Sequence, residues 1–256
     1  MRLKTSLAGR YKQRTRRLDR SDISSKAAIR DERQSLSKRV LVVDVGGSSV
    51  KILVTGEAKF RSFRSGSALT PAHMVSEVKK LAADWTYDVV SIGCPGRVLG
   101  GRLVEQPVNL GRGWVGFDFA RAFGRPVKLV NDAAMQALGS YRGGKMLFVG
   151  LGTGLGAAVI LDGTLLPMEI GHLPYKKATY ERYVGRVGLE RRGKKEWRRH
   201  VADVVKRLTD ALEPDYTVIG GGNVTKLKAL PPGCRLGENA NAFRGGFHLW
   251  KRGRKS

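Results

Sequence analysis

Asp44-Val45-Gly46-Gly47-Ser48-Ser49-Val50-Lys51 is a glycine-rich turn between two apolar runs, and Gly150-Leu151-Gly152-Thr153-Gly154-Leu155-Gly156 repeats this setting further along the chain. An apolar run on each side of a glycine-rich turn predicts a β-hairpin. Because glycine has no Cβ, a phosphate can approach the turn closely and contact successive backbone N–H groups. One such turn alone is weak support for a phosphate site, since most are simply turns. Two in similar settings predict a duplicated fold in which both halves bind phosphate.

Strands and helices alternate around both turns. In the first half we expect strands over 40–43, 50–54, 59–64, 88–93 and 127–130, and helices over 71–85, 117–123 and 133–141. In the second half we expect strands over 146–149, 157–161 and 216–219, and helices over 194–213 and 224–230. This alternation predicts α/β domains with largely parallel sheets, whose ligands bind at the carboxyl ends of strands. We therefore expect an N-terminal domain over 40–132, a C-terminal domain over 133–256 and a central cleft. The pattern leaves the segment Asn241-Ala242-Phe243-Arg244-Gly245-Gly246 unassigned.

Charge is the most unusual property of the composition. The 256 residues carry a formal net charge of +25. Residues 1–39 hold 13 Lys and Arg against 4 Asp and Glu, which leaves a surplus of 16 positive charges in residues 40–256. Such a field attracts polyanions, so we expect a polyanionic partner. Large apolar residues are few in 1–39, which predicts a basic, disordered N-terminal extension.

Composition also argues against several classes of protein. No apolar stretch reaches the ~20 residues of a membrane span, so we expect no membrane partner and a cytoplasmic location. Cys94 and Cys234 are the only cysteines and lack metal-type neighbours, which argues against disulfides and zinc. The sequence does not determine the oligomeric state, and a homodimer is compatible with it.

Seven short motifs follow one another along the chain. They are Asp44 to Gly47, Pro95-Gly96, Asn109 with Trp114-Val115-Gly116, Asn131 to Ala133, Leu151 to Gly156, Glu169 to His172 and Gly220 to Gly222. In kind and order they resemble the ROK family of sugar kinases, most closely its polyphosphate glucokinase branch. The resemblance implies the actin-like ATPase fold, a duplicated ribonuclease H-like architecture of two α/β domains. It also implies a glucokinase that phosphorylates the 6-hydroxyl of glucose with polyphosphate, ATP or both, together with Mg²⁺.

Asp132 is the candidate catalytic residue. It lies at the start of a predicted helix, where the helix dipole favours an ionised carboxylate that can accept a proton from a hydroxyl. Spacing alone fits an ordinary helix cap equally well, because Asp and Asn are both preferred at that position. The resemblance at Asn131-Asp132-Ala133 favours catalysis.

The resemblance also assigns the binding residues. Glucose would be held by Asn109, Asn131, Asp132, Glu169 and His172, whose amides, carboxylates and imidazole suit neutral hydroxyls. The phosphate donor would be held by Gly46, Gly47, Ser48, Gly152, Thr153, Gly154, Gly221 and Gly222. Asp44 would orient Mg²⁺ through water. Taken alone, Glu169 and His172 would be interpreted as structural residues.

Residues 175–200 contain 10 Lys and Arg, 3 acidic residues and interleaved aromatic residues. A run of this kind is most often a solvated helix face. It also fits a track for polyphosphate that leads to the cleft, or for a nucleic acid, whose bases stack on aromatic rings. The leading hypothesis is a glucokinase that uses polyphosphate, ATP or both. The alternatives are a non-catalytic ROK-like protein that responds to sugar and binds nucleic acid, and a kinase of another hexose.

Overall fold

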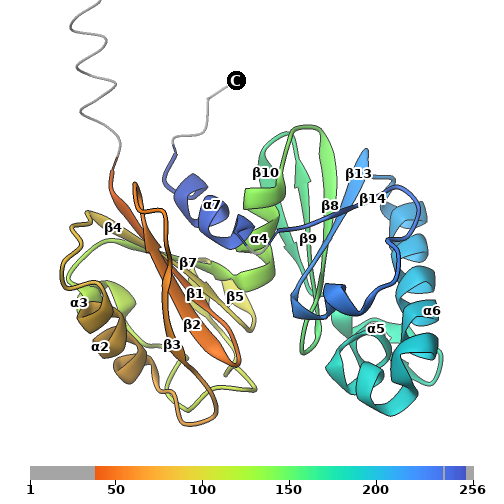
Figure 1. Ribbon diagram of the computed structural model, residues 1–256, viewed down its shortest axis with the longest axis horizontal. Coiled ribbons are helices and arrows are strands. Elements are labelled where there is room, and N and C mark those ends of the chain that lie inside the picture. The colour runs from red at the N-terminus through yellow and green to blue at the C-terminus, as the bar shows by residue number, and fades with distance from the viewer. Residues whose placement is uncertain (1–37, 239, 252–256) are drawn as a thin grey trace, which may run out of the picture. The chain divides into compact units, whose positions relative to one another are not determined.

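The computed structural model describes residues 38–238 and 240–251. The predicted basic extension lies outside these residues, apart from Lys38 and Arg39. The described part of the chain contains two five-stranded sheets, each with its own helices (Figure 1). Within this described part, no helix is both long enough and apolar enough to span a membrane.

The first sheet has the strand order β3-β2-β1-β4-β7. Its strands are β1 (Val40–Val45), β2 (Ser49–Val54), β3 (Arg61–Arg64), β4 (Val89–Cys94) and β7 (Val127–Asn131). β1 and β2 form the first predicted hairpin, and β3 continues it antiparallel to β2. β4 and β7 run parallel to β1, so their carboxyl ends meet at one edge of the sheet.

The second sheet repeats this topology in the order β10-β9-β8-β13-β14. Its strands are β8 (Lys145–Leu151), β9 (Leu155–Leu161), β10 (Thr164–Met168), β13 (Tyr216–Gly220) and β14 (Cys234–Leu236). An antiparallel β8-β9-β10 meander is followed by β13 and β14, which run parallel to β8. The same sequence of pairings in both sheets confirms the predicted duplication.

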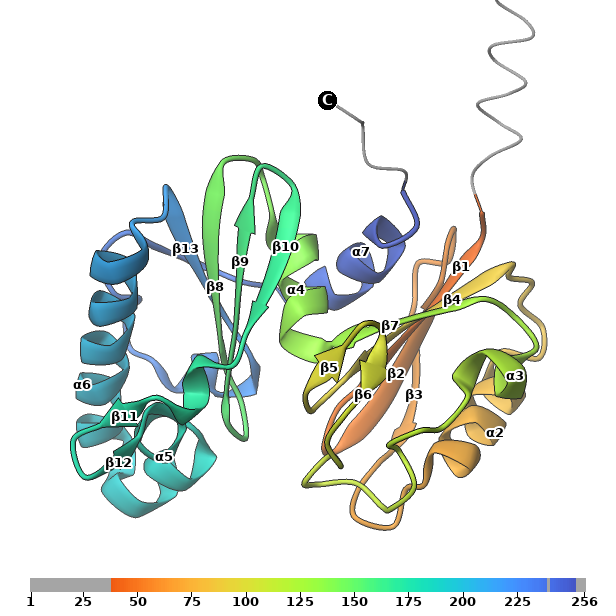
Figure 2. The same ribbon diagram turned by 180° about the vertical axis from the view of Figure 1, so that it is seen from behind.

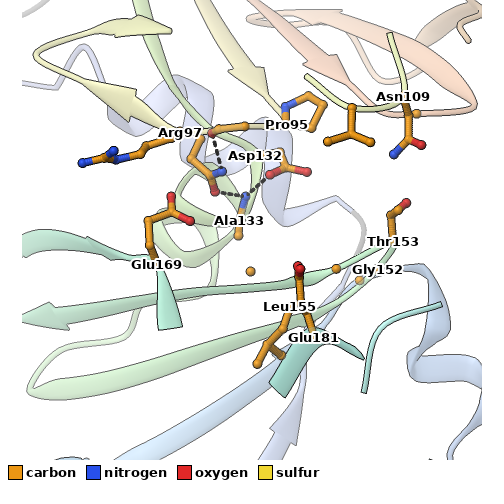
Figure 3. Close-up of a pocket in the computed structure, with 18 of the residues that line it drawn as sticks. Pro95, Arg97, Asn109, Asp132, Ala133, Gly152, Thr153, Leu155, Glu169 and Glu181 are labelled. Atoms are coloured by element: carbon orange, nitrogen blue, oxygen red, sulfur yellow. Dashed lines mark hydrogen bonds between the residues drawn. The ribbon is translucent and has the colours of Figure 1, made fainter. Parts of the chain in front are cut away.

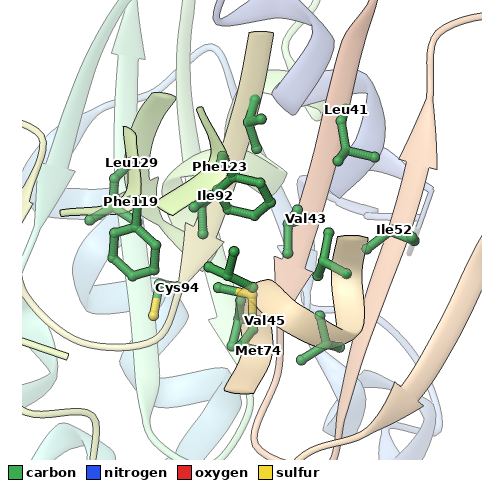
Figure 4. Close-up of a cluster of buried hydrophobic side chains, with 14 of the residues drawn as sticks. Leu41, Val43, Val45, Ile52, Met74, Ile92, Cys94, Phe119, Phe123 and Leu129 are labelled. Carbon is green, nitrogen blue, oxygen red and sulfur yellow. The ribbon is translucent and has the colours of Figure 1, made fainter. Parts of the chain in front are cut away.

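Each sheet buries one face under helices of its own half. In the first sheet, Leu41, Val43 and Ile92 pack against α2 (Pro71–Leu81) and α3 (Phe119–Phe123), as Figure 4 shows. In the second sheet, Leu147 and Val149 pack against Trp197 of the long helix α6 (Arg186–Leu212). These two apolar layers leave the opposite face of each sheet free to pack against a shared helix.

That shared helix is α4 (Asp132–Ser140), which begins directly after β7 and leads into β8. Its Met135 packs with Val42 of the first sheet, whereas Ala133 packs with Phe148 of the second. A helix buried on both sides is held rigidly, so the position of its first turn is well defined relative to both sheets. The division into domains over 40–132 and 133–256 stays a prediction, because α4 belongs to both cores.

The unassigned segment forms helix α7 (Asn241–His248), which packs on α4. The two backbones approach so closely that a Cβ on Gly139 would lie 1.9 Å from the Asn241 carbonyl oxygen. A Cβ on Gly245 would lie 1.7 Å from the carbonyl oxygen of Met135. Glycine at both positions is therefore required for the contact. Ser91 Oγ on β4 also donates to the Gly246 carbonyl at 2.7 Å, which fixes α7 to the first sheet.

Two predicted helices differ from the structure. The helix expected over 71–85 ends at Leu81. The helix expected over 194–213 does form, as the second part of α6, and an unpredicted first part from Arg186 is joined to it at Gly193, whose φ of 70° is not helical. The helix expected over 224–230 is wrong: only a 3-10 turn, η2 (Gly222–Lys226), forms there, and Leu227 is already extended. Leu227 and Leu230 instead pack against the second core.

Candidate active site

The carboxyl ends of three parallel strands bring the motifs of the first half together. Asp44 near the end of β1 is opposite Gly93 of β4, and Cys94 is opposite Asn131 at the end of β7. The Pro95-Gly96 turn follows Cys94, and the Asn131 amide donates to the Gly96 carbonyl at 3.0 Å. The edge predicted to bind ligands therefore carries Asp44, Asn131 and the first residue of α4.

Asn131, and not Asp132, is the cap of α4. Its side-chain oxygen accepts from the backbone N–H of Ala133 at 2.9 Å and of Ala134 at 3.3 Å. The Asp132 carboxylate also accepts from Ala133 at 2.9 Å through Oδ1. No other residue of the described chain hydrogen-bonds this carboxylate. The cap function that spacing alone allowed for Asp132 is thus already performed by its neighbour.

Asp132 lines a cleft of about 500 Å³. The cleft is also lined by other residues predicted for the site, namely Gly47, Asn109, Asn131, Gly152, Thr153, Gly154, Glu169, His172 and Gly221. The remaining predicted residues, Asp44, Gly46, Ser48 and Gly222, do not line it. Gly46, Ser48 and Gly222 are each next in sequence to a residue that does, and Asp44 is near enough to Asp132 for the two carboxylates to interact. Figure 3 shows Asp132, Glu169 and Glu181 around the same space, with Asn109 and Thr153 at one side.

The second hairpin packs directly against the first turn of α4. A Cβ on Gly156 would lie 2.6 Å from the Cβ of Ala133, so only glycine allows this approach. On the other side of the cleft, a Cβ on Gly47 would lie 3.4 Å from the Asn109 Cβ. Both glycine-rich turns line the same cleft as Asp132, the first residue of α4.

The carboxylates at this edge influence one another. Burial raises the pKa of Asp44 to about 6, with a further contribution from the nearby Asp132 carboxylate, while Lys51 acts in the opposite direction. Burial also raises the pKa of Asp132, against the backbone N–H groups that favour its charged form, and Glu169 raises it further. Two carboxylates held close together in a partly buried edge favour a cation or a proton between them.

Three side chains that can hydrogen-bond hydroxyl groups come from the second half of the chain. Glu169 and His172 flank and end the 3-10 turn η1 (Ile170–His172), and both are exposed to the cleft. His172 Nδ1 lies 3.6 Å from Oε1 of Glu181, near the start of α5 (Tyr180–Val184). Glu181, Arg97 and Arg182 line the cleft but were not predicted. The sequence does not single out Glu181 as a site residue, because it is one acidic residue in a strongly basic segment.

The turn predicted to hold the donor is fixed by contacts from distant parts of the chain. The Gly152 carbonyl accepts from the Asn223 amide at 2.8 Å, and the Thr153 carbonyl accepts from the Arg186 N–H at 3.0 Å. A Cβ on Gly154 would lie 2.8 Å from Oε2 of Glu181. The turn therefore contacts α6, η2 and Glu181, one of the side chains that can hydrogen-bond hydroxyl groups.

Comparison with known proteins supports this assignment of the fold. The sequence model of the ROK family matches residues 40–188. Polyphosphate glucokinase of Mycobacterium leprae is 29% identical over 204 residues, which cover 70% of this chain and 62% of that protein. The chain thus spans less than two thirds of the length of that relative.

Solved structures share the architecture over nearly their whole length. The inorganic polyphosphate/ATP-glucomannokinase of Arthrobacter sp. strain KM superposes with a TM-score of 0.70 at 22% identity, covering 83% of this chain and 98% of that one. A ROK family glucokinase from Streptomyces griseus, solved with glucose and AMPPNP, gives 0.69 at 17% identity and covers 84% and 100%. At these identities the likeness concerns the fold, and the predicted actin-like ATPase fold is confirmed.

Proposed function

Because the chain belongs to the ROK family, we propose that it is a glucokinase that transfers a phosphoryl group from polyphosphate, ATP or both to the 6-hydroxyl of glucose. One observation carries the proposal. The Asp132 carboxylate faces a cleft between two glycine-rich turns, and Asn131 performs the helix capping that would otherwise explain it. The polyphosphate glucokinase name of the M. leprae relative supports the choice of sugar and donor.

Asp132 acts as the base in this proposal. As the sugar oxygen forms a bond to phosphorus and the donor's bridging P–O bond breaks, the hydroxyl proton passes to the carboxylate. Burial raises the pKa of Asp132, which makes the carboxylate a stronger proton acceptor than an exposed one. The fixed first turn of α4 supplies the positioning on which phosphoryl transfer depends.

The sugar is held from both halves of the chain. Asn109 and Asn131 contribute amides from the first half, and Glu169, His172 and Glu181 contribute acceptors and an imidazole from the second. Each sugar hydroxyl is both donor and acceptor, so amides and carboxylates on opposite walls can bind several hydroxyls at once. A kinase of mannose, fructose or an amino sugar would use the same groups.

The donor is bound by the turns and by nearby cations. Backbone N–H groups of Gly152 and Gly154 and the Thr153 hydroxyl suit phosphate oxygens, with Gly47 and Gly221 on the same cleft. Arg182 lines the cleft, and α6 begins beside Thr153. Lys194 and Lys195 lie further along the exposed side of α6. Exposed cations on the helix that begins beside the donor turn would suit a long phosphate chain as a donor.

Magnesium fits the residues at the edge of the first sheet. Mg²⁺ is usually held by one or two carboxylates together with water and substrate phosphates. Asp44 offers such a carboxylate, and an adjacent cation would lower its pKa from the raised value of about 6, while Asp132 stays free to act as the base. The described residues contain no cluster of three or more metal-binding side chains. When bound, the ion would neutralise charge on the transferring phosphoryl group.

The proposal is tested with a matrix of donors and sugars. Purified protein is incubated with polyphosphate or ATP and with glucose, mannose, fructose or glucosamine, and the sugar 6-phosphate is measured. Glucose 6-phosphate formed with at least one donor supports the proposal. If only another hexose is phosphorylated, that hexose and not glucose is the substrate. No transfer to any sugar, combined with tight and salt-dependent DNA binding, would favour the nucleic-acid alternative, which the charge of +25 keeps open. A cytoplasmic location and a homodimer stay predictions.

A further inference from the structure

A buried hydrogen-bond network joins the strand after η1 to α6. The Tyr175 hydroxyl, on the short strand β11 (Pro174–Tyr175), donates to Oδ2 of Asp203 at 2.7 Å. His200 Nδ1 lies 3.0 Å from the same hydroxyl. Since the hydroxyl proton goes to Asp203, a proton on Nδ1 lets His200 donate to the Tyr175 oxygen, while its Nε2 lies 3.3 Å from Oε1 of Glu196. Tyr175 and His200 are 4% and 6% exposed, so the bond between them is shielded from water, whereas the bond to Asp203 lies at the edge of the buried region.

The network is reinforced by edge-on aromatic contacts and by α5. The Tyr175 ring lies edge-on to Tyr183 at 5.0 Å, and Tyr183 lies edge-on to His200 at 4.8 Å. The Trp197 indole N–H donates to the Val184 carbonyl at 2.7 Å, which joins the end of α5 to α6. Figure 2 shows β11, β12 (Ala178–Thr179) and α5 beside the first part of α6.

The elements joined in this way carry the hydroxyl-binding groups of the second half. Glu169 and His172 precede Tyr175 by six and three residues, and Glu181 follows it by six. Little regular structure holds this part of the chain, because β11 and β12 pair over only Pro174–Thr179 and Tyr175–Ala178. Tyr175 lies at the centre of the segment and connects it to a long helix that packs on the second sheet.

We propose that Tyr175, together with His200 and Asp203, is a positioning device that holds Glu169, His172 and Glu181 at the spacing a sugar requires. This inference rests on the proposed function for the role of those three groups. The hydroxyl is the important part of Tyr175, because the ring alone would fill the same space. Removing the hydroxyl leaves the buried Nδ1 of His200 without its acceptor, and Asp203 keeps only the Arg207 guanidinium as a donor, on α6 itself. The segment then loses its hydrogen-bonded attachment to α6.

Hydrogen exchange of the free protein tests the positioning without depending on activity. The variant is Tyr175→Phe, and the matched control is Tyr180→Phe, a neighbouring ring 5.3 Å away whose hydroxyl makes no hydrogen bond among the described residues. We expect amides of residues 169–175 to exchange about tenfold faster in Tyr175→Phe than in the control. Equal exchange in the two variants would overturn the proposal, whether or not the protein is a kinase.

Steady-state kinetics test the link to the sugar. Loss of positioning should raise the KM for the hexose about tenfold in Tyr175→Phe, with kcat and the KM for the donor within about twofold, because a binding group is displaced and the chemistry is retained. A role in packing alone would lower the melting temperature and leave the KM for the hexose unchanged, which would overturn the proposal.

Asp203 provides a second route should Tyr175→Phe fail to fold. Its side chain is 41% exposed, so Asp203→Ala removes the acceptor with little effect on the core. Asp203→Ala should raise the KM for the hexose as Tyr175→Phe does, and Asp203→Asn, which keeps an acceptor oxygen, should restore it to within about threefold of the wild type. An unchanged KM in Asp203→Ala would contradict the proposal. A wild type that phosphorylates no hexose would refute the proposed function, while the exchange experiment would still decide the positioning.

Discussion

Replacing Asp44 by Asn should stabilise the protein at neutral pH and change it little in acid. The folded pKa of Asp44 is about 6, against an ordinary value of 3.8, because the carboxyl is buried and lies near Asp132. Between these two pH values the folded carboxyl is protonated and the unfolded one is ionised. The unfolded state then binds fewer protons, so the wild type loses stability as pH rises through this window.

The size of the effect follows from the displacement of the pKa. One pKa unit corresponds to about 1.4 kcal/mol. A rise of the pKa to about 6 therefore lowers the free energy of unfolding of the wild type by about 3 kcal/mol above pH 6. Asn cannot ionise, so Asp44→Asn lacks this loss. Part of the rise comes from Asp132, and Asp132→Asn should therefore shift the end of the window to lower pH.

Urea unfolding of the wild type and Asp44→Asn, at several pH values between about 4 and 8 and without divalent cations, measures the difference. Comparing two proteins at each pH cancels the titration of all other groups. The free-energy difference should grow by about 2.5 kcal/mol from pH 4 to pH 7.5 in favour of the variant, because part of the total has already appeared at pH 4. A difference that stays constant with pH would refute the claim that Asp44 is buried beside Asp132.

Three further predictions concern the sugar, the fold and the donor. Glu181→Gln should raise the KM for the hexose about tenfold with an unchanged KM for the donor in initial-rate assays, since one charged acceptor is lost. Gly156→Ala should lower the free energy of unfolding measured in urea by about 1–3 kcal/mol, because the new Cβ would lie 2.6 Å from the Cβ of Ala133 in the first turn of α4. Gly152→Ala, whose Cβ would have no atom within 4 Å, should unfold like the wild type. Changing Lys194 and Lys195 together to Gln should raise the KM for polyphosphate several-fold and leave that for ATP unchanged, and equal effects on both donors would exclude a track along α6.

Local patterns were sufficient to predict the framework of the fold. The hairpins at Gly46-Gly47 and Gly152 to Gly154 were predictable because each needs only neighbouring residues, an apolar run on either side of a flexible turn. The order of the motifs then placed Asp132 between them, where the structure has it. The choice between a cap and a base could not be made from spacing, because Asn131 and Asp132 are both good caps and only the contacts show which one is used.

Features that depend on contacts between distant residues were missed. Helix α7 has two glycines in its centre, which lower helix propensity. It forms because Gly245 allows close packing on α4 and Gly246 allows close packing on Val42 of β1. Helix 224–230 was predicted from composition, but Leu227 and Leu230 are drawn to the second core instead. Glu181 became recognisable only when the fold placed it beside His172 and the turn at Gly154.

The central claim is that the Asp132 carboxylate accepts the proton of the sugar hydroxyl, and the turnover number of Asp132→Asn tests it most directly. Asn131 still caps α4 in this variant, so the fold is retained, and Asp118→Asn, at the cap of the distant helix α3, is the matched control. We predict that kcat for hexose phosphorylation falls by a factor of about 100 or more in Asp132→Asn, while the control keeps wild-type activity. A kcat within about threefold of the wild type would contradict the account.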